Sequence, residues 1–344
     1  MDLTHLVHTM KGVDVKQQCA SVTRTTLLGA VLAAIASPAL AVEGGVGAYF
    51  LGTRDSLAGI VPPPGTYLSF TFDRLEGSVQ GLSVGGLPIR ADTDLSLNLL
   101  RIGITQSFDA TLWGGTPAAN VTIPVLNPQL DYVAVTPPIA GAAIQDSTSG
   151  IGDISVTGLV GWHREKLHYS TGMTIYAPTG DYDTASINIS ERTIDSLSNG
   201  KNVWSFQPFV AVTWLNPDTG LELSGAASLL FSTKNSATEY QTAPALTLEG
   251  AVVQRIPSGW GFGLTGYYYQ QLDDDSGSGA NLTRAALGAD SLRARVAGVG
   301  PMITYSGGQL FGADLSFKAK YVKEFEGKRR FESEIFTLNL SLAF

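Results

Sequence analysis

The sequence is nearly free of cysteine and poor in charge, and together these shortages are unusual for a soluble enzyme. Its one cysteine, Cys19, precedes an apolar run near the amino terminus, so no disulfide framework can stabilise the chain downstream. Only 15% of the residues are charged, although 44% are hydrophobic. Four histidines, no His/Cys metal spacing and no nucleophile elbow give no pattern for catalysis. We therefore expect no enzyme, no catalytic or metal-binding residues and no cofactor.

Long hydrophobic runs are also missing, since a spanning helix needs about 20 consecutive apolar residues. Leu27–Ile35 is much shorter; Arg24 precedes it, and the small residues of Ser37–Ala41 follow. This pattern predicts a cleaved export signal over residues 1–41. The net charge of -8 argues against nucleic acid as a partner.

The carboxy-terminal residues alternate strictly between apolar and small or polar side chains. Because successive side chains of a strand point to opposite faces, this segment is predicted to form a strand with one apolar face, and the strand ends on an aromatic residue. Such a strand closes a transmembrane barrel and would be its contact with the outer-membrane assembly machinery, although an edge strand of a soluble sandwich is the alternative. The apolar positions are Phe336, Leu338, Leu340, Leu342 and Phe344, and the others are Thr337, Asn339, Ser341 and Ala343.

Breaks between the remaining apolar stretches alternate between short and long. Short turns are expected near residues 107–109, 164–166, 216–219, 257–258 and 307–308, and longer loops near 81–90, 137–150, 179–201, 234–242, 273–290 and 324–329. This sorting predicts an all-β protein, a transmembrane antiparallel up-and-down barrel of about 12 strands (14 possible) over residues 66–344. Short turns would face the periplasm and long loops the outside of a bacterial outer membrane. A soluble sandwich or lectin-type domain is the competing class.

Residues 42–65 do not fit the count of twelve strands. The segment is rich in glycine and ends in Pro62-Pro63-Pro64, and three successive prolines cannot donate to a central ladder. It is a possible plug that narrows the barrel from the periplasmic side. An extra strand over 45–53 or a flexible tail are the alternatives.

Charged and aromatic side chains on the expected inward faces are the candidate site residues. Charges of both signs can be solvated or paired in the wide lumen of such a barrel, so they would form either a polar ladder along a conduit or an ion-pair network that braces the wall. Three tyrosines would form a mouth for an aromatic ligand. The charged candidates are Arg293, Arg295, Lys318, Lys320, Glu222 and Glu249, and the tyrosines are Tyr176, Tyr267 and Tyr269.

Several short motifs together resemble one family. They are Pro62–Tyr67, Gly150–Asp153, Pro178–Asp183, Asn202–Ser205, Thr238–Tyr240 and Gly300-Pro301, followed by the terminal Phe344. The ordered set, over about residues 44–344, resembles the phenol degradation, meta-pathway family of outer-membrane proteins.

The resemblance implies a function. It implies an outer-membrane channel for passive uptake of small hydrophobic or aromatic compounds, whose partners are membrane lipids and the solute. The alternative is a structural or surface-binding barrel with a closed lumen.

Overall fold

A computed structural model describes residues 43–135 and 138–344, which all lie in one compact unit, Ser37–Phe344. The predicted export signal over residues 1–41 lies outside the described residues and stays a prediction.

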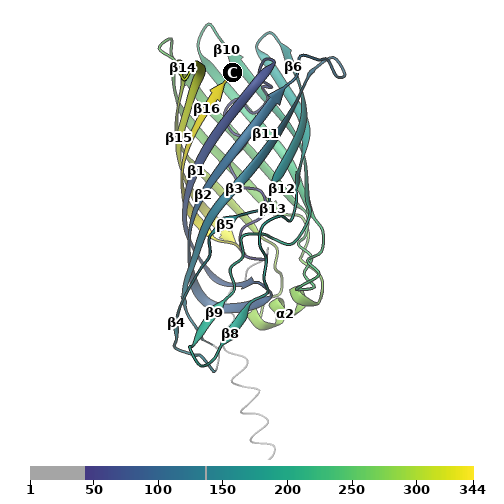
Figure 1. Cartoon of the computed structure of the whole chain (residues 1–344), viewed down its shortest axis with the longest axis vertical. Helices are drawn as coiled ribbons and strands as arrows, with labels where there is room; N and C mark the ends of the chain where they lie inside the picture. The colour runs from purple at the N-terminus through teal and green to yellow at the C-terminus, as the bar shows by residue number, and fades with distance from the viewer. Residues whose placement is uncertain (1–42, 136–137) are drawn as a thin grey trace, which may run out of the picture. The chain divides into compact units, whose positions relative to one another are not determined.

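Twelve antiparallel strands close into a barrel, which confirms the predicted fold class (Figure 1). The last strand pairs with the first in unbroken register, from Tyr67 opposite Ala343 to Ser78 opposite Glu332. Closure pairs the first strand of the sheet with the last, as a sheet surrounded by hydrocarbon requires. The barrel strands are β1 (Gly65–Val84), β2 (Leu87–Ser107), β3 (Thr116–Val133), β6 (Ser155–Arg164), β7 (Leu167–Tyr176), β10 (Ser205–Asn216), β11 (Leu221–Ser232), β12 (Ala245–Arg255), β13 (Trp260–Gln271), β14 (Arg295–Leu310), β15 (Ala313–Lys328) and β16 (Glu332–Ala343).

Shorter elements lie in three of the connections. Strands β4 (Ala143–Ser147) and β5 (Gly150–Ile151) pair with β3, and β8 (Ser186–Asn188) pairs with β9 (Thr193–Asp195). Helix α2 (Ser278–Leu287) connects β13 to β14 and contacts β1 and β2. Figure 1 shows β4, β8, β9 and α2 gathered at one end, which we call the long-loop end; the opposite, short-turn end holds the carboxy terminus.

Two predicted connections next to β2 are wrong. The expected long loop at 81–90 is a two-residue turn, Gly85-Gly86, with φ of 53° and 81°. Glycine adopts positive φ at both central positions, as a tight type I′ hairpin needs, so β1 and β2 continue past the barrel wall. The expected tight turn at 107–109 is instead an eight-residue connection, 108–115.

Strands β14 and β15 also extend beyond their predicted ends. The pair Gly307-Gly308 is not a turn. Pairing of β14 with β15 shifts register between Ser306 and Gln309, continues to Leu310, and ends at a turn over Phe311-Gly312. At the other end, β15 runs to Lys328, so the predicted loop at 324–329 is a short turn.

The outward face of the barrel is apolar, as the alternation predicts. Side chains such as Phe336, Val210 and Leu264 are exposed, while their neighbours along each strand point inward. Hydrocarbon is the solvent that such a band fits. Within the described ranges, no helix combines the length and apolarity needed to cross a membrane. Other exposed apolar residues on the same face are Phe72, Leu100, Ile104, Val121, Val156, Phe206, Val212, Leu223, Phe231, Leu248, Val252, Phe262, Val299, Tyr321 and Phe325.

Buried apolar side chains gather inside the barrel towards the long-loop end. One contiguous cluster joins the extended β1–β2 hairpin to the loops, through residues such as Leu82, Tyr240, Leu292 and Phe331. The core of this protein therefore fills one end of the lumen and the space beneath its loops.

Candidate functional site

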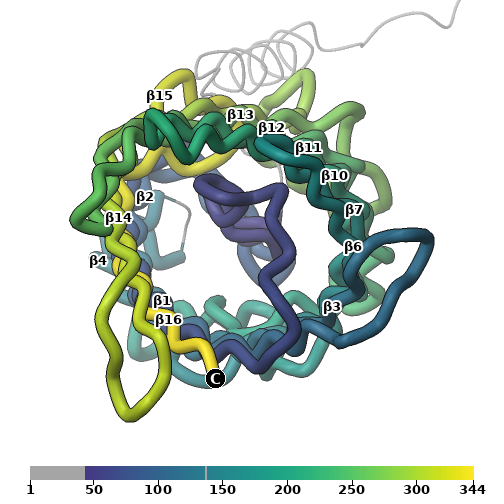
Figure 2. The backbone as a smooth tube through the Cα atoms, turned by 90° about the horizontal axis from the view of Figure 1, so that it is seen from above, coloured from purple at the N-terminus to yellow at the C-terminus, as the bar shows by residue number. Residues whose placement is uncertain are grey.

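Residues 43–64, here the inner segment, run inside the barrel from one end to the other (Figure 2). At the short-turn end, Ser107 Oγ donates a 2.8 Å hydrogen bond to the carbonyl oxygen of Pro62. At the long-loop end, Asn235 Nδ2 donates to the Glu43 carboxylate at 2.9 Å. The inner segment forms no strand of the barrel. Its backbone makes hydrogen bonds mainly with side chains of the barrel wall.

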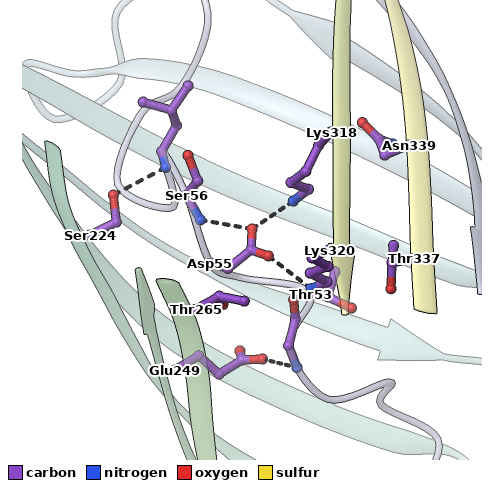
Figure 3. Close-up of polar contacts among 12 residues, drawn as sticks. Thr53, Asp55, Ser56, Ser224, Glu249, Thr265, Lys318, Lys320, Thr337 and Asn339 are labelled. Carbon is purple, nitrogen blue, oxygen red and sulfur yellow. Dashed lines mark hydrogen bonds and ion pairs between the residues drawn. The ribbon is translucent and has the colours of Figure 1, made fainter. Parts of the chain in front are cut away.

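Asp55 is the most completely enclosed contact of the inner segment (Figure 3). Its carboxylate is 1% exposed and lies between two ammonium groups of β15, 2.6 Å from Lys318 Nζ and 2.8 Å from Lys320 Nζ. Lys320 also donates to the carbonyl oxygen of Gly52. The two predicted inward lysines are therefore engaged by the inner segment.

Glu222 of β11 makes a second contact between the wall and the inner segment. Its carboxylate accepts from the backbone N–H of Leu57 at 2.7 Å and from Ser56 Oγ at 3.1 Å. Arg255 Nε donates to the same carboxylate at 2.9 Å. The cost of burying this charge is thus offset by an ion pair and by hydrogen bonds.

Glu249 makes a similar contact from β12. It accepts from the backbone N–H of Gly52 at 2.6 Å and from the hydroxyl of Tyr49. The wall carboxylates therefore satisfy backbone donors that have no strand partner. Some ion pairs join one strand to another, as Arg255 and Glu222 do, whereas Lys318 and Lys320 pair with the inner segment through Asp55.

The three predicted tyrosines point inward but do not converge on one ligand position. Tyr176 donates to Gln207 Oε1 at 3.0 Å, and Tyr267 donates to Glu324 Oε1 at 2.7 Å. The Tyr269 ring lies under the Arg330 guanidinium, 4.9 Å from its carbon. Of the three, Tyr176 and Tyr269 line the cavity described below.

The predicted inward position of Arg293 and Arg295 is wrong. Both guanidinium groups are about half exposed, 3.6 Å from Asp273 and 4.0 Å from Glu326 respectively. The alternate residues Leu292, Ala294 and Val296 face the core instead and are fully buried. Apolar packing at the long-loop end occupies the inward side, so the cations remain in contact with water.

A cavity of about 310 Å³ lies between the inner segment and the wall formed by β2, β3, β6 and β7. Its wall on β2 and β3 is mostly apolar, with Arg101, Asn120 and Thr122 as its polar residues, and the inner segment contributes Val46, Ala48 and Phe50. This volume is at the lower end of the roughly 300–1,000 Å³ range of small-molecule sites. The apolar wall residues are Leu95, Leu97, Leu99, Leu126 and Leu130.

Apolar and polar residues do not alternate strictly over residues 91–136, and the apolar wall of the cavity is the reason. Leu99 lines the cavity while the adjacent Leu100 is exposed on the outer face, so both faces of β2 are apolar. No bulge interrupts the pairing of β2 with β3 from Thr93 opposite Tyr132 to Ser107 opposite Ala118, although the pairing of β1 with β2 shifts register between Gln80 and Leu82. Loss of alternation over these residues is a sequence signal that could have located the cavity.

Two arginines lie at the deep end of the cavity, and the sequence patterns identified neither of them as a site residue. Arg54 donates to Gln207 at 3.1 Å and to Thr174 at 2.9 Å, and its guanidinium carbon lies 4.1 Å from the Phe209 ring centroid. It makes no ion pair with a residue that the structure describes. Arg101, in contrast, is paired with Asp73 at 2.8 Å.

A third cation, Lys201, lies at the long-loop end of the cavity, between β9 and β10. Its backbone N–H donates to Asp153 Oδ2 at 2.8 Å, whereas its ammonium makes no hydrogen bond or ion pair within residues 43–135 and 138–344. Burial lowers the pKa of the Lys201 ammonium, against the attraction of Asp153 and Glu43. Burial also raises the pKa of the Asp153 carboxyl, against hydrogen bonds from the backbone of Gly180 and Lys201. Among the described residues, no cluster of three or more His, Cys, Asp or Glu side chains could hold a metal.

A closed barrel with an apolar outer band and short turns at one end is the fold of an outer-membrane β-barrel protein. The fold is similar to that of the COG4313 outer membrane channel from Pseudomonas putida F1, with a TM-score of 0.59 and 12% sequence identity over 84% of this chain and 99% of that one. The bacterial outer membrane is therefore its location, as predicted.

Weaker likenesses extend to other barrels. The transport unit of the autotransporter AIDA-I from Escherichia coli has a TM-score of 0.46 and 10% identity, over 85% of this chain and 95% of that one. The CymD monoaromatic hydrocarbon channel has a TM-score of 0.42 and 8% identity, over 88% of this chain and 95% of that one.

Residues 73–340 match the family described as "Putative MetA-pathway of phenol degradation", and the chain belongs to this family. The match confirms the resemblance drawn from the motifs. No curated protein has a sequence that matches the chain.

Proposed function

We propose that the protein is an outer-membrane channel for passive uptake of small hydrophobic or aromatic compounds, and that it is not an enzyme. The observation that carries the proposal is the row of leucines on the inner face of β2 and β3. Leucines that face the lumen favour contact with apolar solutes, whereas a pore for polar solutes is lined by polar side chains. Family membership and the channel among the fold relatives support it.

The chain would divide into an export signal over 1–41, a plug over 42–65 and a barrel over 66–344. The plug would narrow the lumen on the side of β11, β12 and β15, where Glu222, Glu249, Lys318 and Lys320 bind it. Solute would pass on the opposite side, along the leucines and past Tyr176 and Tyr269. The assembly machinery would recognise β16.

The alternative is a structural or surface-binding barrel whose lumen stays closed. The inner segment favours this alternative. It crosses the lumen and is bound to the wall by Glu222, Glu249 and Lys320, so it reduces the open cross-section of the barrel. In that case the long loops would carry the function.

Flux into liposomes separates the two proposals. Purified protein is reconstituted, and passage of toluene is compared with passage of arabinose, in the parent and in a variant that lacks residues 43–60. The channel proposal expects toluene to pass through the parent faster than arabinose, and both to pass faster through the deletion variant. If the parent passes neither solute while the deletion variant passes both, the closed-lumen alternative is the better account.

A further inference from the structure

The long-loop end of the cavity combines one free cation with an apolar wall. Lys201 is partly buried, lines the cavity, and its ammonium has no partner in the part of the chain that the structure describes. An ammonium that borders an apolar cavity without a hydrogen bond or ion pair among the described residues is available to an anionic group of a solute.

The nearby carboxylates Asp153 and Glu43 attract the Lys201 ammonium, but neither lies within ion-pair distance of it, and each accepts hydrogen bonds from other groups. Asp153 accepts from the backbone N–H of Gly180 at 3.0 Å and from that of Lys201 at 2.8 Å. Glu43 accepts from Asn235 Nδ2 at 2.9 Å and from Thr238 Oγ1 at 3.1 Å.

Asn199 supplies a second unpartnered polar group at the same end. It is 9% exposed and lines the cavity, and its Oδ1 is buried without a hydrogen-bond partner among the described residues. Its Nδ2 makes only a long contact, 3.4 Å from Thr148 Oγ1. This oxygen has almost no accessible surface, so Asn199 borders the cavity without offering Oδ1 to a solute.

We infer that Lys201 binds the acidic head of an amphipathic solute, a small aromatic carboxylate whose ring lies against the leucines of β2 and β3. The ammonium provides the charge-assisted hydrogen bond that a carboxylate accepts, and the apolar wall removes the ring from water. This inference rests on the proposed uptake function and names a substrate class for it: aromatic acids, alongside neutral hydrocarbons.

Binding of benzoate, benzamide and toluene to the purified full-length barrel tests the inference. Benzamide has nearly the shape of benzoate without the charge, and toluene has no polar head. In the parent we expect benzoate to bind about tenfold or more tightly than benzamide, since hydrogen bonds to charged groups are the stronger ones. Lys201→Met should abolish that preference and leave toluene binding within about twofold of the parent, whereas Lys201→Arg should retain most of the preference.

Lys234→Met is the matched control, because Lys234 lies on a neighbouring loop, is exposed, and pairs with Glu239 outside the cavity. It should leave all three affinities unchanged. The inference is overturned if the parent does not prefer benzoate to benzamide, or if Lys201→Met weakens toluene as much as benzoate. Toluene flux without benzoate preference defeats the inference alone, whereas absence of both toluene binding and toluene flux defeats the proposed function as well.

Discussion

Replacement of Asp55 by asparagine should release the inner segment without opening the barrel wall. Asp55 lies between Lys318 and Lys320 at 2.6 and 2.8 Å, and Asp55→Asn leaves two largely buried ammonium groups without this counter-charge. Loss of one partner from a buried ion pair costs about 3–5 kcal/mol. The wall is closed by its own strand pairing, so this cost falls on the docking of the segment. Docking should then weaken by about 10²- to 10³-fold.

Hydrogen exchange and conductance measure this release. The backbone N–H groups of Gly52, Leu57 and Gly59 donate to wall side chains, so peptides that cover them should exchange much faster in Asp55→Asn. Single-channel conductance should rise, while the heat-modifiable band of the folded barrel should persist. Glu334→Gln is the control, because it removes an exposed ion pair with Lys323 on the next strand and should change neither measurement. Unchanged exchange and conductance in Asp55→Asn would refute the docking argument.

Three further changes test the faces of the barrel and its closure. Leu340→Arg places a charge on the lipid face of β16 and should lower barrel stability by roughly 2–4 kcal/mol in a denaturant titration. The inward change Asn339→Arg should lower the stability much less. The reverse order would mean that the register of β16 is wrong by one residue. Deletion of Phe344, whose backbone N–H and C=O both bond to β1, should reduce the heat-modifiable band in outer-membrane fractions, and full assembly without it would count against its role in closure. Leu97→Asn should slow toluene flux by roughly fourfold for each methylene that no longer packs against the solute, since a buried CH₂ is worth about 0.8 kcal/mol, and an unchanged flux would place the solute path elsewhere.

Much of the barrel follows from the sequence because lipid imposes a simple rule on each strand. Every second residue must be apolar, so strands such as β10 and β16 could be predicted with the correct faces. The rule fails where both faces are apolar. It therefore could not give the register of residues 91–136, where Leu99 faces the cavity and Leu100 the membrane. It also fails beyond the membrane, where the packing of Leu292 and Ala294 under the loops turned Arg293 outward.

The inner segment is the part that only the tertiary structure decided. Its glycines and prolines argued against a central strand, but they left open whether the segment is a plug, an extra strand or a tail. Asp55 meets Lys318 across 263 residues of chain, and Gly52 and Leu57 find their acceptors on two further strands, β12 and β11. Such contacts have no periodicity along the sequence, because they form only after twelve strands have closed around one lumen and brought their inward charges together.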